Sequence, residues 1–277
     1  MATEKIVSSA PLRVFITGAS SGLGAALARY YAQQGAILGL VGRRREALQQ
    51  LQATFPTMTS FVYAIDVNDH AALADAAADF IGRGGIDIVI ANAGISAGTL
   101  TERHEDLAVF ERIVATNLTA TVATFAPFIA AMKAAAALMA QQSRPQRQRP
   151  LRLVGIASVA GIRGLPGAGA YSASKAAVIS YCESLRVELQ STGIRVVTIA
   201  PGYIDTPMTQ HNAYPMPFLM SADAFARRAA QAIESGDRFR VIPWQMGWVV
   251  RLLRWMPNAF YDWLFKKMPR KKRAFAD

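Results

Sequence analysis

Six short apolar runs recur along the chain up to residue 200, and stretches of helical length separate them. Few polar residues interrupt the runs, which is typical of strands that are covered on both faces. Such strands in alternation with helices are typical of a parallel sheet. The pattern therefore predicts a single doubly wound α/β domain of the Rossmann type, with helices on both faces of the sheet and strands at residues 13–17, 36–41, 60–65, 86–91, 151–157 and 195–200.

Two segments do not follow this rhythm. Residues 141–150 are polar, basic and rich in proline, and we expect an exposed loop there. Beyond Pro201 the sequence is irregular, then helical, then basic. We expect the domain to cover residues 1–243, followed by an amphipathic helical extension at 244–277. In that extension Pro257 should end a first helix, with Arg251 and Arg254 on the side away from the apolar residues.

Composition narrows the class of protein. The 277 residues are 52% hydrophobic with a mean hydropathy of +0.19, which excludes a disordered chain. The single cysteine, Cys182, cannot form an internal disulfide, and we expect it to pack inertly in a helix of a protein from a reducing compartment. The first residues lack the apolar stretch of a signal peptide, and no apolar run is long enough to predict a membrane span. We therefore expect a cytoplasmic protein, in which the alanine-rich segment 118–140 is a buried or subunit-facing helix.

The charge is strongly positive and unevenly distributed. The net charge is +11, and residues 244–277 contain eight Lys or Arg against two Asp. No zinc-finger spacing or other nucleic-acid motif accompanies this charge, so we expect no nucleic-acid partner. The three histidines are scattered, and we expect no metal site.

The sequence TGASSGLG at 17–24 joins the first predicted strand to a helix. Glycines in this position let the chain turn tightly and allow a pyrophosphate to approach the backbone at a helix N-terminus. The context predicts a dinucleotide-binding loop formed by Gly18, Ser20, Ser21, Gly22, Leu23 and Gly24.

The end of the second strand indicates which dinucleotide binds. An acidic residue here would hold the ribose 2′-hydroxyl of NAD, but the sequence VGRRREAL places Arg43 and Arg44 at this point. A guanidinium can bind a 2′-phosphate that a carboxylate would repel. The arginines predict NADP(H), and the alternative is that they only begin a solvated helix.

Tyr171 and Lys175 lie four residues apart and would share one face of a helix. A free tyrosine has a pKa of about 10, and we expect the nearby ammonium to lower the pKa of Tyr171 so that it can exchange a proton with a substrate oxygen. Ser158 follows a predicted strand, where it could hold the same oxygen. Asn117 could anchor a water that relays protons through Lys175.

Together with ANAG at 91–94 and PGYIDTP at 201–207, these motifs resemble the short-chain dehydrogenase/reductase family in order and spacing over residues 12–210. The resemblance implies a catalytic tetrad of Asn117, Ser158, Tyr171 and Lys175, with Lys175 also holding the nicotinamide ribose. The departures are small: ANAG stands in place of the commoner NNAG, and Ala157 in place of a frequent serine. The remaining cofactor contacts that the resemblance implies are Asp66 and Val67 at the adenine, Asn92, Ala93 and Gly94 along the cofactor, and Pro201, Gly202, Ile204 and Thr206 over the nicotinamide.

The resemblance implies an NADPH-dependent oxidoreductase that transfers hydride between nicotinamide and a carbonyl or alcohol. Its substrate lid would lie at about 203–226, where Met208, Tyr214, Met216, Phe218, Leu219 and Met220 indicate a lipophilic ketone, such as a long-chain 3-oxo lipid or a steroid-like compound. These side chains would equally serve to close the lid onto the core. The alternatives are a 3-oxoacyl carrier protein reductase and a non-catalytic NADP-binding regulatory protein.

The family also implies a homodimer or homotetramer, with contacts through segment 118–140 and the helix that contains Tyr171. The aromatic and basic residues at 244–273 fit three explanations: association with a membrane surface, packing within the fold or between subunits, and docking of an acidic carrier protein.

Overall fold

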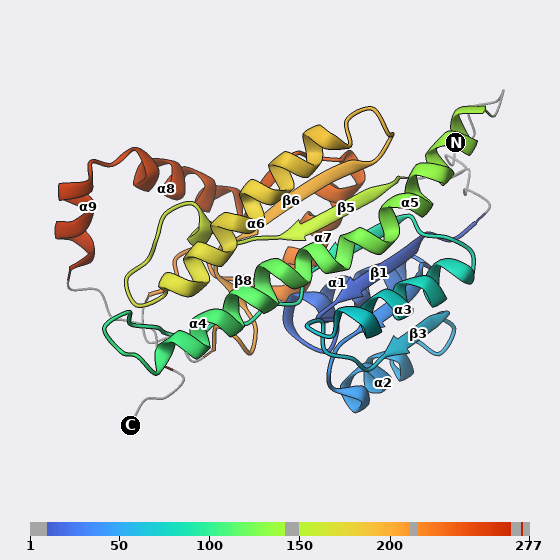
Figure 1. The fold of residues 1–277 in the computed structure, drawn as a ribbon, viewed down its shortest axis with the longest axis horizontal. Coiled ribbons are helices and arrows are strands. Elements are labelled where there is room, and N and C mark those ends of the chain that lie inside the picture. Colours follow the sequence, from blue (N-terminus) through green and yellow to red (C-terminus); the bar gives the residue numbers. More distant parts are fainter. Residues whose placement is uncertain (1–9, 142–149, 211–214, 267–272, 274–277) are drawn as a thin grey trace, which may run out of the picture.

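A seven-stranded parallel sheet forms the centre of the molecule (Figure 1). The structure is a computed structural model that describes residues 10–141, 150–210, 215–266 and 273. The strand order is β3-β2-β1-β4-β5-β6-β9, so the direction of winding reverses between β1 and β4. The strands are β1 Arg13–Thr17, β2 Ile37–Val41, β3 Ser60–Tyr63, β4 Ile88–Ala91, β5 Arg152–Ile156, β6 Arg195–Pro201 and β9 Phe239–Ile242.

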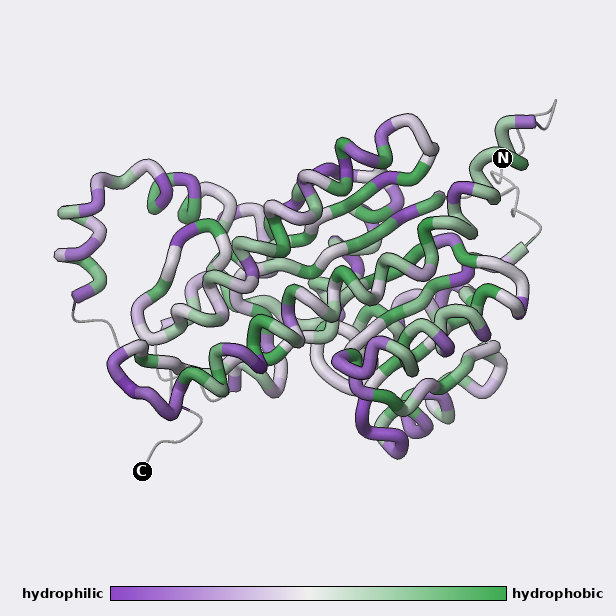
Figure 2. The backbone as a smooth tube through the Cα atoms, viewed as in Figure 1, coloured by the Kyte–Doolittle hydropathy of each residue, from purple (hydrophilic) through white to green (hydrophobic). Residues whose placement is uncertain are grey.

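Helices cover both faces of the sheet, as the sequence predicted. Helices α1 (Gly22–Gln33), α2 (Arg45–Ala53) and α7 (Ala222–Ser235) bury apolar side chains in the core on one face. Helices α3 (His70–Gly82), α5 (Ala120–Gln141) and α6 (Gly169–Glu188) do so on the other. The apolar strands run between these two layers (Figure 2).

Three strands beyond Pro201 were not predicted from the sequence. Strand β9 is short and lies at the edge of the sheet beside β6, and Phe239 and Arg240 are exposed. Its pattern therefore lacks the continuous apolar character of the central strands. Two further strands, β7 (Ile204–Asp205) and β8 (Met220–Ser221), pair with each other at the two ends of the predicted lid.

One helical run extends from Asp106 to Gln141 through three segments. Helix α4 (Asp106–Val114) continues into a π-helical turn, η1 (Ala115–Thr119), and then into α5. By length and composition this run could cross a membrane, but core helices of soluble proteins pass the same test. Phe125, Phe128 and Met132 are fully buried against the sheet, whereas Leu138 on the outer side is exposed. The segment 118–140 therefore has one core-facing side and one open side.

The C-terminal extension forms two helices, α8 (Trp244–Trp255) and α9 (Asn258–Phe265), and Pro257 separates them as predicted. The expected position on α8 was wrong for Arg251. Its guanidinium lies 5.4 Å from the centre of the Trp248 ring, so it shares the exposed side of the helix with the aromatics, where a cation can stack on a ring. Cys182 is buried in α6, as expected. The loop predicted at 141–150 falls almost entirely outside the described residues.

Candidate active site

The loop between β1 and α1 forms a backbone cradle. Gly18 has a φ of +68°, in the left-handed region that favours glycine. A Cβ at Gly24 would lie 2.2 Å from the carbonyl oxygen of Gly18, so the helix start and the loop approach too closely for any side chain. Ser21 precedes α1 and makes no side-chain capping hydrogen bond to it. The first backbone N–H groups of α1 can therefore bind an anion.

Asn92 and Thr17 connect this cradle to β4. The Asn92 amide donates to the carbonyl oxygens of Thr17 at 3.0 Å and Gly18 at 3.3 Å. In return the Thr17 hydroxyl accepts hydrogen bonds from the backbone N–H groups of Asn92 and Ala93. These bonds fix the ANAG segment beside the glycine loop, at the point where the winding of the sheet reverses.

Two arginines lie at the end of β2, next to the cradle. Arg44 donates from Nη2 to the carbonyl oxygen of Ser20 at 3.1 Å and lies 3.4 Å from its hydroxyl. Arg43 is 3.9 Å from the Asp66 carboxylate, and the side chain of Arg43 is largely exposed while that of Asp66 is partly so. The arginines line the same pocket as Ser20 and Gly42. This end of the pocket is therefore positively charged and open to solvent.

Asn117 lies in the π-helical turn η1, a feature that the sequence did not reveal. Its Oδ1 accepts from the backbone N–H of Ile95 at 2.8 Å, and its Nδ2 donates to the Ile95 carbonyl at 3.0 Å and the Ser174 hydroxyl at 2.9 Å. The side chain is fully buried. A π turn widens a helix locally, and such turns are frequent at functional sites. Here it ties the helical run to the segment after β4 and to α6.

Ser158, Tyr171 and Lys175 meet at the carboxyl ends of β5 and β6. The side chains of Ser158 and Tyr171 are hydrogen-bonded to each other. The Lys175 ammonium donates to the carbonyl oxygen of Ile156 at 2.8 Å and lies 6.0 Å from the centre of the Tyr171 ring. A Cβ at Gly161 would lie 2.6 Å from the backbone carbonyl carbon of Lys175, so the turn after Ser158 packs directly on the α6 backbone.

The protonation of this group differs from the sequence-based expectation. Burial raises the pKa of Tyr171 above its ordinary value, and the hydrogen bond with Ser158 opposes this by a smaller amount. Burial also lowers the pKa of Lys175 to about 8. The expectation that Lys175 lowers the pKa of Tyr171 was therefore wrong for the protein alone, because desolvation of the phenolate dominates.

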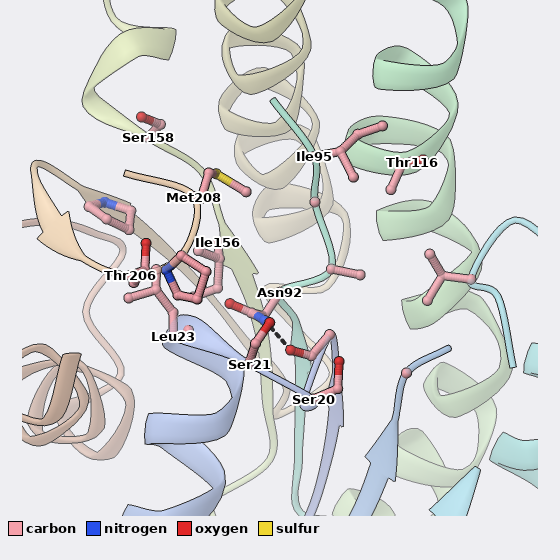
Figure 3. A pocket seen from close by; sticks show the side chains of 18 of the residues that line it. Ser20, Ser21, Leu23, Asn92, Ile95, Thr116, Ile156, Ser158, Thr206 and Met208 are labelled. Carbon is pink, nitrogen blue, oxygen red and sulfur yellow. Dashed lines mark hydrogen bonds between the residues drawn. The ribbon is translucent and has the colours of Figure 1, made fainter. Parts of the chain in front are cut away.

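A pocket of about 370 Å³ joins the cradle to this polar group. Ser20, Ser21 and Asn92 gather at one end, and Ser158 and Met208 at the other (Figure 3). Of the predicted site residues only Gly24 and Asn117 are absent from its lining: Gly24 packs beneath the loop, and Asn117 is buried and hydrogen-bonded to Ile95, which does line the pocket. Residues of the lining that the sequence analysis did not identify include Gly42, Ile65, Asn68, Ile95, Arg112, Thr116, Ile156 and Thr209.

Several of these additional residues are placed only by the fold. Thr116 accompanies the π turn, and Asn68 donates to its hydroxyl at 3.2 Å. No local motif marks such residues, although their neighbours in the predicted motifs could have directed attention to them. Within the described part of the chain no cluster of side chains could hold a metal ion, and His211 lies outside that part.

The chain belongs to the short-chain dehydrogenase family. A sequence model described as short chain dehydrogenase matches residues 13–215. An uncharacterized oxidoreductase of Myxococcus xanthus is 36% identical over 254 residues, which cover 89% of this chain and 93% of that protein. The 11-beta-hydroxysteroid dehydrogenase A of Arachis hypogaea is 37% identical over 204 residues, which cover 71% of this chain and 53% of the relative.

Solved structures share the fold. Levodione reductase superposes with a TM-score of 0.72 at 27% identity, over 83% of this chain and 95% of the other. The family places the protein among NAD(P)-dependent oxidoreductases and confirms the class that the motifs indicated.

Proposed function

We propose that this protein is an NADPH-dependent reductase of a lipophilic ketone. The observation that carries the proposal is a single pocket, lined at one end by the glycine cradle and the arginines and at the other by Ser158, Tyr171 and Lys175. The cradle fits a dinucleotide, because Gly18 and Gly22 line it without side chains and the N–H groups at the start of α1 are open to a pyrophosphate. The bound cofactor would supply hydride.

The residues at the other end divide the remaining work. Ser158 holds the substrate oxygen, and Tyr171 donates a proton to it as the carbonyl becomes an alcohol. The raised pKa keeps Tyr171 protonated and ready to donate. Lys175 would hold the nicotinamide ribose and assist the return of a proton to Tyr171. Asn117 keeps the Ile95 segment in place beside Gly94, whose Cβ position lies close to both Asn117 Oδ1 and Lys175 Nζ.

The preference for NADPH rests on the end of β2. Arg43 and Arg44 line the pocket where a 2′-phosphate would lie, with Gly42 and Ser20 beside them. The two guanidinium groups offer charge-assisted hydrogen bonds that a 2′-hydroxyl would use less well. Asp66 and Val67 would contact the adenine, and Pro201, Gly202, Ile204 and Thr206 would close over the nicotinamide.

The rim beside the nicotinamide end supports a lipophilic substrate. Met208 lines the pocket while remaining 42% exposed, and Phe218 and Leu219 of the lid are about half exposed. Side chains that only closed the lid onto the core would be buried. The name of the Arachis hypogaea relative refers to a hydroxysteroid, which is consistent with a large apolar ketone.

The proposed enzyme is an oligomer that acts at a membrane surface. The exposed outer side of α5, together with α6, is the surface through which we expect a homodimer or homotetramer to form. We place the enzyme in the cytoplasm at a membrane surface, because a lipophilic ketone partitions into lipid.

Substitution of Tyr171 tests the chemistry. Tyr171→Phe should abolish NADPH-dependent reduction of any accepted ketone, whereas NADPH binding, followed by cofactor fluorescence, should persist. Tyr30→Phe, the same substitution on α1 outside the pocket lining, is the matched control and should retain turnover. Turnover by Tyr171→Phe, or NADPH binding by the wild type without turnover across ketones and 3-oxoacyl thioesters, would contradict the assignment. A clear preference for thioesters would instead favour a carrier-protein reductase.

A further inference from the structure

Helices α8 and α9 expose an unusual number of large apolar side chains. On α8 they recur at helical spacing along one side, and Trp255 at its end is 89% exposed. On α9 the rings of Phe260 and Trp263 stack on each other with their centres 5.6 Å apart. We call these seven side chains the aromatic face: Trp244, Trp248, Leu252 and Trp255 of α8, and Phe260, Trp263 and Leu264 of α9.

This exposure does not result from loose attachment of the helices. Met246 and Val250 of α8 and Tyr261 and Phe265 of α9 are buried, so each helix already has an inward side. Arg163, from the loop after β5, donates to the carbonyl oxygens of Leu253 and Met256 and to the Asn258 side chain. The aromatic face is therefore the outward side of two anchored helices.

The corner between the two helices is braced from the body of the protein. The guanidinium of Arg163 lies 4.0 Å from the centre of the Tyr261 ring, and the Tyr261 hydroxyl donates to the carbonyl oxygen of Gly164. The hydrogen bonds from Arg163 to Leu253 and Met256 satisfy carbonyl groups at the end of α8 that the helix itself leaves free. The brace fixes the direction in which α8 and α9 leave the domain, at the left of Figure 1.

Basic side chains border the aromatic face. Arg251 stacks against Trp248, and Arg254 and Lys266 are also exposed. Among the described residues of α8 and α9 the only carboxylate is Asp262. The partner of this surface should therefore be apolar in its interior and negatively charged at its boundary.

A second copy of the chain fits this description poorly. A two-fold contact brings the same surface of both subunits together, so it would place these cations against their own copies with only Asp262 to offset them. An acidic protein would satisfy the charge, but charged residues are depleted at the centres of protein interfaces, where four tryptophan side chains would need an apolar partner. An anionic lipid interface offers both properties, and tryptophan is enriched at that depth.

We propose that the aromatic face inserts into the interface of an anionic membrane, with Arg251, Arg254 and Lys266 contacting lipid phosphates. This proposal deepens the membrane location proposed above by identifying the surface and the lipid. Gly202, in the pocket lining, packs against Met246 of α8. Insertion of α8 would therefore hold the substrate end of the pocket near the lipid.

Vesicle co-sedimentation of the full chain tests the proposal. The wild type should bind vesicles of phosphatidylcholine with phosphatidylglycerol, and should bind vesicles of phosphatidylcholine alone much less. The double variant Trp248→Ser/Trp255→Ser should no longer bind these vesicles. High salt should weaken binding of the wild type in part, because it screens the charges. Arg251→Gln/Arg254→Gln should weaken binding by about tenfold or more. Leu107→Ser, which removes an exposed apolar side chain of α4 that belongs neither to the aromatic face nor to the expected subunit surface, should bind normally.

Two further measurements distinguish membrane binding from the proposed enzymatic function and from a contact between subunits. NADPH turnover with a water-soluble ketone should be the same in all these variants. If the wild type shows no turnover, the proposed function is contradicted, but the result says nothing against membrane binding. Sedimentation velocity should give the same oligomeric state for wild type and the tryptophan variant. The proposal is overturned if the wild type ignores anionic vesicles, if the tryptophan variant still binds them, or if that variant only changes from oligomer to monomer.

Discussion

Arg273 forms a double ion pair with Asp106, the first residue of the helical run that also contains Asn117. Its Nε lies 2.9 Å from Asp106 Oδ2, and its Nη2 contacts Asp106 Oδ1 at 3.1 Å and Glu105 at 2.7 Å. Asp106 is almost fully buried and also accepts a hydrogen bond from the backbone N–H of Leu100. A residue near the end of the sequence thus holds the segment that follows the ANAG motif.

This ion pair predicts an acid-sensitive contribution to stability. The hydrogen bonds from Arg273, and then from Leu100, hold the pKa of Asp106 below its ordinary value of 3.8. A carboxyl with a lowered pKa in the folded state stabilises the fold above its unfolded pKa, and this stabilisation disappears as pH falls through the folded pKa. Arg273→Met should therefore lower the Tm near neutral pH, and the difference from wild type should shrink in acid. A difference that does not depend on pH would contradict the assignment.

The brace at Arg163 predicts local rather than global destabilisation. Arg163→Met removes the donors to the end of α8, so hydrogen exchange should accelerate at Leu253–Asn258 while the protection of β4 and β5 stays unchanged. Arg163→Lys keeps the charge but cannot reach the same set of acceptors, and should give an intermediate result. Uniform loss of protection throughout the domain would show that Arg163 supports the core instead.

The arginines at the end of β2 predict the coenzyme preference. Arg43→Asp/Arg44→Asp should reduce the ratio of kcat/KM for NADPH over NADH by about ten- to a hundredfold, because charge-assisted hydrogen bonds are lost and a 2′-phosphate is repelled. Arg45→Asp is the matched control, since Arg45 begins α2 and is absent from the pocket lining. An unchanged ratio in the double variant would remove the case for NADP(H).

The buried ammonium of Lys175 should lower the stability of the fold although the proposed reaction requires it. Its folded pKa of about 8 lies below the ordinary 10.5, so the unfolded chain binds more protons between these values and the buried ammonium destabilises the fold below pH 8. Lys175→Met should be inactive, yet more stable below pH 8 by about 3 kcal/mol at most. Urea unfolding of the cofactor-free protein should show this gain fading as pH approaches 10.5, whereas a gain that persists there would contradict it.

The close approach at Gly24 predicts loss of cofactor binding on addition of one methyl group. Gly24→Ala would place Cβ against the Gly18 carbonyl and the Asn92 amide, so the cradle must widen. NADPH affinity should fall by at least about tenfold, and stability should fall with it. Gly82→Ala, at the end of α3, meets no atom within 4 Å and should change neither property. Equal behaviour of the two variants would mean that the cradle tolerates expansion.

The features that were predicted most completely are those formed by residues close together in the sequence. The cradle lies in a strand, turn and helix that are contiguous, and Tyr171 and Lys175 are one helical turn apart, so spacing alone placed them. Contacts between distant segments left no comparable pattern. Nothing near Arg163 marks α8 as its partner 90 residues away, and Arg273 could have paired with any exposed carboxylate.

Other features depended on burial or on irregular backbone. The direction of the pKa shift of Tyr171 follows from desolvation of the phenolate in the folded protein, which a motif does not reveal. The π turn at Asn117 occurs within a sequence that reads as ordinary helix. Strand β9 was overlooked because an edge strand with exposed Phe239 and Arg240 lacks the apolar run that identified the others.

The contact between Gly161 and the backbone of Lys175 has a consequence for directed evolution. Main-chain packing sets the spacing between the Ser158 turn and α6, and no side chain at Gly161 can adjust it. A library that varied this turn would mostly yield proteins in which the two segments no longer meet. New substrate ranges should come instead from substitutions at the rim of the pocket. Met208 and the ends of the lid can change there without altering the arrangement of Ser158, Tyr171 and Lys175.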